Sequence, residues 1–231
     1  MEADLSYAYL ERACLYSTHL EGADLRNAHL ESAILKRTHL EGANIQEAFF
    51  DSLTLLNEST FGDTEYGAVA IADIHWGNVN IAVVGWSAIS KLGDEKKFGY
   101  EFKYEPKYMT YERAARAYRQ LSVVLRNQGL NENAARFTYR AQLMQRKIFW
   151  YRRKYLQYLG SLFLDLLSGY GYKPLRCFAA SMTSFHGRGF FPGSSITLDD
   201  PLTVVAALEA FIGLLIEVTL IATLTQRLFG R

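Results

Sequence analysis

The fold is decided by residues 3–55, which read ADLSYAYLERACLYSTHLEGADLRNAHLESAILKRTHLEGANIQEAFFDSLTL. An apolar residue, usually leucine, recurs at every fifth position from Leu5 to Leu55. A small residue, alanine or threonine, precedes each by two positions as far as Ala48, and Leu53 breaks the rule. Neither a helix, with about 3.6 residues per turn, nor a strand, which alternates, has this period. The pattern predicts a coil in which each repeat forms one side of the cross-section, with small and large residues inside.

Units such as Ala3-Asp4-Leu5, Ala23-Asp24-Leu25 and Ala43-Asn44-Ile45 resemble those of the pentapeptide-repeat family. The resemblance implies a right-handed quadrilateral β-helix with four repeats per coil. Neighbouring coils would then lie about 4.8 Å apart, as neighbouring strands do.

The repeat resumes after residue 61 with its phase moved by one residue, as in Gly67-x-Val69 and Ala82-x-Val84. We therefore expect an irregular corner at Leu56–Phe61, followed by further coil. The alternative for residues 68–89 is a pair of ordinary β-strands, because valine and isoleucine favour strands. The first coil begins almost at Met1 without a visible cap, so the natural chain is expected to begin earlier.

Charge is divided unevenly along the chain. Residues 1–105 hold 17 acidic and 8 basic side chains, a net charge of −9, whereas residues 106–231 hold 7 acidic and 17 basic, a net charge of +10. The two halves are therefore expected to have different surroundings. The two cysteines, Cys14 and Cys177, make no disulfide framework and indicate a reducing compartment. The sequence contains no recognisable nucleophile–base pair, phosphate loop or metal cluster, so we expect neither an enzyme nor a cofactor.

A helical hairpin is expected after the coil. Thr110 is placed to cap a first helix, Gly129 to end it, and Asn131 or Asn133 to cap a second. The pair resembles a single tetratricopeptide-type unit, but one hairpin is weak evidence for peptide binding and favours the alternative, a spacer packed on the end of the coil.

The stretch 146–154 is basic and aromatic. Its cations are Arg146, Lys147, Arg152, Arg153 and Lys154. A nucleic-acid patch, a solvated helix face and a juxtamembrane segment are all compatible with this composition. The next residues, 155–168, favour the third, because apolar side chains gather on one face of a helix too short to span a bilayer but suited to its interface. A lipid bilayer is therefore an expected partner, and nucleic acid is not.

Residues 202–224 form the longest apolar run, 23 residues that would span about 34 Å as a helix. They predict a C-terminal transmembrane α-helix that begins after Asp200-Pro201, and a buried helix of a soluble core is the alternative. Glu209 and Glu217 lie within the run, and intramembrane carboxylates usually face a bundle interior or an aqueous cavity.

Residues 180–193, ASMTSFHGRGFFPG, resemble the pore loop of two-transmembrane-type ion channels, and Glu209 followed by Gly213 resembles the start and hinge of their inner helix. The filter-like residues are Thr183, Ser184, Phe185, His186, Gly187, Arg188 and Gly189. Phe185 and Arg188 stand where potassium filters have threonine and tyrosine, and a surface Gly-Pro loop is the alternative.

Taken with the repeats, this tail resembles bacterial pentapeptide-repeat proteins with a C-terminal ion-channel domain. The resemblance implies transport of monovalent cations, potassium among them, by a homo-oligomer, a tetramer. Channels of this type have an outer helix before the pore loop, yet only 202–224 is long enough to span, so we expect that helix to be missing near residues 178–180.

The flanking cations predict that the coil and hairpin face the cytoplasm, beneath the inner (plasma) membrane. The alternative function is a soluble or peripheral interaction protein of the DNA-mimic or topoisomerase-binding type, which the acidic front half permits electrostatically.

The expected fold is mixed, and its parts are a β-helix over 1–92, a linker over 93–106, a hairpin with a basic-aromatic end over 107–154, an interfacial helix and the start of a possible outer helix over 155–179, and a pore-loop-like segment with the transmembrane helix over 180–231.

Overall fold

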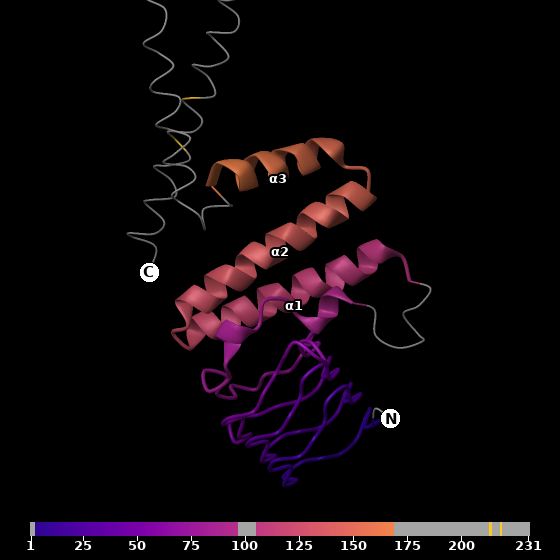
Figure 1. The fold of residues 1–231 in the computed structure, drawn as a ribbon, viewed down its shortest axis with the longest axis vertical. Coiled ribbons are helices and arrows are strands. Elements are labelled where there is room, and N and C mark those ends of the chain that lie inside the picture. The colour runs from indigo at the N-terminus through magenta and orange to yellow at the C-terminus, as the bar shows by residue number, and fades with distance from the viewer. Residues whose placement is uncertain (1–2, 97–104, 169–212, 214–217, 219–231) are drawn as a thin grey trace, which may run out of the picture. The chain divides into compact units, whose positions relative to one another are not determined.

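The computed structural model describes residues 3–96 and 105–168, together with Gly213 and Val218 (Figure 1). The chain divides into two compact units, residues 1–154 and 155–231.

The first unit begins with a coil of stacked repeats. Its levels pair through single parallel bridges between residues 20 positions apart, from Asp4–Asp24 to His29–Phe49. Backbone hydrogen bonds flank each bridge, as where the Leu5 N–H donates to the Asp24 carbonyl at 2.7 Å. Four repeats therefore complete one turn, as the resemblance implied. Within the described residues the pairing stays at single bridges and forms no extended strand.

The interior of the coil is filled by the two predicted positions of each repeat. From residue 20 to residue 50 both are buried, for example Ala33 and Leu35, each at 0% exposure. A turn follows each large residue from Leu5 to Ile45, and its second position has a positive φ, as in Tyr7 (58°) and Glu47 (59°). Glycine adopts this conformation at no steric cost, whereas other residues lose about 1–2 kcal/mol. The stacked hydrogen bonds and buried side chains of the coil offset that cost.

The register shifts earlier than predicted. Ile34 pairs with Leu55, 21 positions on, so the extra residue lies in the corner before Leu55 and not at 56–61. Leu56 takes the buried large position and Thr54 the small one, while Leu53 is 67% exposed. Asp51 holds this corner by accepting hydrogen bonds from the N–H groups of Leu53 and Thr54.

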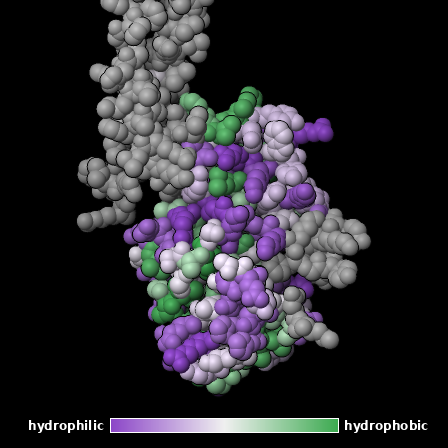
Figure 2. Space-filling model, viewed as in Figure 1, coloured by the Kyte–Doolittle hydropathy of each residue, from purple (hydrophilic) through white to green (hydrophobic). Residues whose placement is uncertain are grey.

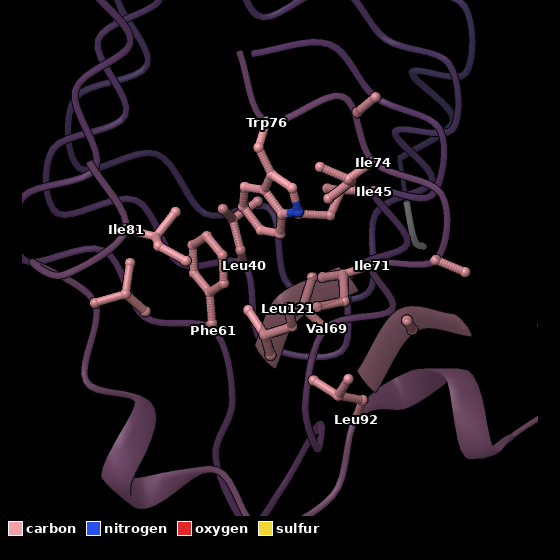
Figure 3. Close-up of a cluster of buried hydrophobic side chains, with 14 of the residues drawn as sticks. Leu40, Ile45, Phe61, Val69, Ile71, Ile74, Trp76, Ile81, Leu92 and Leu121 are labelled. Atoms are coloured by element: carbon pink, nitrogen blue, oxygen red, sulfur yellow. The ribbon is translucent and has the colours of Figure 1, made fainter. Parts of the chain in front are cut away.

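The coil resumes, as expected, after a short excursion. Gly62 pairs antiparallel with Ala68, and the stack then continues through the bridges Asn44–Ala70 and Phe49–His75. The predicted register was wrong in one respect. The prediction placed Val69, Ile74 and Val79 in the large position, but they take the small one. The large position belongs to Ile71, Trp76 and Ile81, which are also buried. Figure 3 shows these side chains gathered in the core together with Leu121 of the following helix.

Two short 3-10 turns, η1 (Trp86–Ala88) and η2 (Gly93–Glu95), close the coil. Asp94 of η2 is fully buried, and its carboxylate accepts hydrogen bonds from the N–H groups of Ile71 and Ala72 and from the Gln46 amide. The first residues of the expected linker are thus packed into the coil.

The hairpin consists of α1 (Lys107–Asn127) and α2 (Asn131–Tyr151). Gly129 ends α1 with φ +82°, and the Leu130 N–H bonds the Leu125 carbonyl, so the predicted C-terminal glycine is confirmed. The predicted N-terminal caps of the two helices were wrong. Thr110 does not cap α1, because the helix begins directly after Pro106 and buries Thr110 inside it. No asparagine side chain caps α2, whose N-cap position is Leu130.

Helix α1 lies across the end of the coil, and α2 packs alongside it (Figure 1). The Gln128 side chain accepts from the N–H groups of Ile81 and Ala82 and donates to the Val79 carbonyl at 2.8 Å. Gln120 accepts from the Asp73 N–H. Side chains of the hairpin therefore satisfy backbone groups of the last coil, which agrees with the alternative of a spacer packed on the coil end.

In the second unit the described part is α3 (Tyr155–Ser168), with Gly213 and Val218 in helical conformation further on. None of the helices in the described ranges is long and apolar enough to cross a membrane.

Candidate functional site

The candidate site is the outer face of α3. Leucine and phenylalanine recur along the helix at the spacing of one stripe, and the structure leaves these side chains exposed. The exposed fraction is 87% for Leu156, 57% for Leu159 and 42% for Leu162. The apolar surface of α3 is visible in Figure 2. A helix of a soluble protein normally turns such a stripe towards a core.

The polar side of α3 is less exposed than its apolar side. Tyr158, Ser161 and Asp165 are only partly exposed, in contrast to the leucines around them. Gln157 is the exposed polar residue between them and the apolar stripe. This arrangement is the reverse of the one that water favours, and it suits an apolar environment against the leucine face.

The basic-aromatic residues at the end of α2 divide into two groups. Lys147 lies 3.9 Å from Glu95 and its ammonium stands over the Tyr111 ring, while Arg152 is ion-paired with Glu112. Arg153 and Lys154, which follow α2 and precede α3 in the sequence, are exposed, as is the Trp150 ring at 54%. Part of the expected positive patch is thus neutralised within its own unit, and its last two cations face solvent.

Arg146 is half-buried in α2. The filter-like residues, Thr183 to Gly189, lie outside the described part of the chain, and so do Glu209, Glu217 and the junction at residues 178–180. Gly213, the expected hinge, is described as a buried helical residue. The structure therefore does not test whether the predicted pore residues lie close together.

The comparisons with known proteins support the first half of the prediction. A family model described as pentapeptide repeats (8 copies) matches residues 23–55. That stretch is a run of pentapeptide repeats, and the match ends at Leu55, where the extra residue shifts the register. No curated protein matches the chain. The ion-channel resemblance of residues 180–231 has no support in these comparisons.

Sequence reasoning missed the outward-facing residues of the coil. Tyr9, His29, Phe49 and His75 form an aromatic ladder, with ring centroids 5.1, 4.6 and 4.4 Å apart in turn. His19 and His39 stack in the same way at 4.8 Å. Part of the signal was present in the sequence, because Tyr9, His29 and Phe49 recur 20 positions apart at the middle position of the repeat, as do His19 and His39, whereas His75 follows Phe49 by 26 positions.

Proposed function

We propose that this protein is a membrane-associated pentapeptide-repeat protein whose α3 lies in the bilayer interface. The observation that carries the proposal is the outward apolar face of α3, with Leu156 at 87% and Leu159 at 57% exposure. Burying one leucine side chain contributes about 1.5–3 kcal/mol, so partial insertion of several of them is enough to hold such a helix at the interface.

The residues that precede α3 in the chain support the same proposal. Exposed Arg153 and Lys154 would contact anionic headgroups, each adding about 1 kcal/mol. Trp150 is suited to the depth of the headgroups. On this proposal the repeat coil and its hairpin form a platform on the cytoplasmic side.

The finer part of the proposal is cation transport by residues 180–231. Cation transport is proposed from the sequence resemblance alone. It is tested by measuring potassium flux into liposomes that contain the full-length protein. The competing class, a soluble interaction protein, would remain in the supernatant when cell membranes are pelleted.

The interfacial position of α3 can be tested in liposomes of anionic composition. A single cysteine carrying an environment-sensitive fluorophore is placed at Leu159, or at Gln157 as the matched control, in full-length protein lacking Cys14 and Cys177. We expect the label at 159 to be quenched by lipids with a spin label in the acyl chain, and the label at 157 by aqueous iodide. Equal aqueous quenching at both positions would contradict an interfacial α3.

A further inference from the structure

A second feature lies on the coil of the first unit. The pentapeptide Thr-His-Leu-Glu-Gly occurs twice, at residues 18–22 and 38–42. Because one turn of the coil takes 20 residues, the two copies occupy the same face on neighbouring levels, and His19 pairs with His39. Their rings stack 4.8 Å apart and nearly parallel. The repeat therefore places two histidines and two glutamates side by side.

Three of these side chains converge. Glu21, His39 and Glu41 each offer a ligand atom, and these atoms all lie within 4.8 Å of one another. His39 Nδ1 and Glu41 Oε1 are 3.3 Å apart. Two ligands of one tetrahedral Zn²⁺ ion, each at about 2.1 Å from the metal, are separated by about 3.4 Å. Small side-chain rotations would bring the three atoms to that spacing.

The buried member of the cluster is incompletely satisfied. The Glu41 side chain is only 8% exposed, and its Oε2 atom is buried without a hydrogen-bond partner in the described part of the chain. A buried carboxylate oxygen with no partner is costly, and a bound cation is one of the few groups that can compensate it. Glu41 thus points independently to a ligand between the two levels.

We propose that Glu21, His39 and Glu41 form a binding site for a first-row divalent transition-metal ion of the Zn²⁺ type. One imidazole nitrogen and two carboxylate oxygens are a donor set that suits Zn²⁺ and its neighbours in the series, whereas Mg²⁺ and Ca²⁺ prefer oxygen alone. Water would complete the coordination on the solvent side. The site does not depend on the membrane role proposed for α3.

A related cluster, Glu11, His29 and Glu31, has the same composition. Its Glu11 is exposed and its Glu31 side chain is 34% exposed, against 8% for Glu41, although Glu31 Oε2 is itself buried without a hydrogen-bond partner within the described residues. His29 is also held in the aromatic ladder, between Tyr9 and Phe49. We therefore assign the stronger site to Glu21, His39 and Glu41.

The test uses tag-free, full-length protein that has been stripped with a chelator. Binding of Zn²⁺, and of Mg²⁺ in parallel, is followed by calorimetry, and the visible spectrum of the Co²⁺-loaded protein reports its ligands. We expect one tight equivalent of Zn²⁺, no comparable binding of Mg²⁺, and a melting temperature raised by Zn²⁺. Glu41→Gln should weaken Zn²⁺ binding at least about tenfold and remove the Co²⁺ band.

The controls are His75→Asn and Glu47→Gln, which change a histidine and a glutamate outside the cluster and should leave binding unchanged. His39→Asn serves as a second variant if Glu41→Gln does not fold, as judged by circular dichroism. The proposal is overturned if Zn²⁺ does not bind stoichiometrically, if it binds no better than Mg²⁺, or if folded Glu41→Gln or His39→Asn retains the affinity of the parent protein.

Discussion

The corner at Asp51 gives the most direct test of how the coil tolerates its extra residue. The Asp51 carboxylate accepts hydrogen bonds from the N–H and hydroxyl of Ser32, each at 2.8 Å, one level away. It also accepts from the N–H groups of Leu53 and Thr54 within its own corner. Asp51→Asn keeps the shape of the side chain but removes its charge, so it isolates the contribution of the ionised form.

The contribution of ionised Asp51 to stability follows from the pKa of its carboxyl group. Burial opposes ionisation of Asp51, but the hydrogen bonds from Ser32, Thr54 and Leu53 outweigh it and lower the pKa from 3.8 to about 2. Each unit of pKa corresponds to about 1.36 kcal/mol, and solvent screening at this partly exposed corner reduces the sum, so ionised Asp51 contributes about 1–2 kcal/mol. Because the pKa in the folded state is below that in the unfolded state, this stability is fully present above about pH 4 and is lost as the pH falls through about 2.

Urea unfolding of the full-length protein, followed by tryptophan fluorescence between pH 7 and pH 2, measures this contribution. We expect Asp51→Asn to lower the free energy of unfolding by about 1–2 kcal/mol at pH 7, and the difference from the parent to shrink towards pH 2. Asp4→Asn is the control, because within the described residues the hydrogen bonds of the Asp4 carboxylate come from Ser6 of the same turn and not from another level. An unchanged stability at pH 7, or a loss that stays constant down to pH 2, would refute the role of Asp51.

Two further predictions concern the end of the coil. Gly77 has φ +47° and a Cβ there would lie 2.0 Å from the Phe50 carbonyl oxygen, so Gly77→Ala should destabilise the fold by about 3 kcal/mol or more. Gly129→Ala, at φ +82° with open space around it, should cost only about 1 kcal/mol, and equal melting temperatures of the two variants would contradict this reasoning. Gln128→Met should cost about 2 kcal/mol, because it leaves the Ile81 N–H and the Val79 carbonyl unpaired, whereas the Ala82 N–H keeps its bond to Asn80. Hydrogen exchange at residues 79–82 should rise in this variant but not in Gln145→Met, whose amide bonds Arg119 on the exposed surface.

The sequence predicted the first coils well because a period of five leaves little freedom. Only one placement buries both the alanines and the leucines of residues 20–50, and the structure adopts it. The register beyond residue 50 was misjudged because Leu53-Thr54-Leu55-Leu56 offers an apolar residue in either phase. The choice between the two registers depends on the hydrogen bond between Asp51 and Ser32, 19 positions earlier. This contact exists only once the levels are stacked.

The same ambiguity explains why the register of the resumed coil was predicted wrongly. Pairs such as Val69 and Ile71, or Val79 and Ile81, are apolar at both inward positions, so the period could be read but the two positions could not be told apart. In the hairpin, Tyr118 and Leu121 of α1 are fully buried, and their spacing of three residues places them on one helix face. In α2 the apolar residues spread around the helix, and the buried face runs through Phe137 and Met144, while Tyr139 is only partly buried.

For the candidate site, the sequence supplied the stripe on α3 but could not say how exposed it is. In the structure Ser161 and Asp165 are less exposed than Leu156 and Leu159, an order that the helical spacing alone does not determine. The glutamate–histidine cluster was invisible for a similar reason. A search for metal ligands at local spacing passes over residues 20 positions apart, although the coil makes them neighbours.

The end of the coil explains why the hairpin and the repeats form one unit. A stack of β-bridges leaves unpaired N–H groups at its last level, and such an edge promotes association with other chains. Here side chains of α1 occupy that edge, with Gln128 on Ile81 and Ala82 and with the Tyr118 hydroxyl accepting from the Leu92 N–H at 2.8 Å. The Tyr118 hydroxyl in turn donates to Glu95, which is ion-paired with Arg140 of α2. A displacement of α2 relative to the coil would have to break this connected set, so the coil and the end of α2 are expected to move as one body.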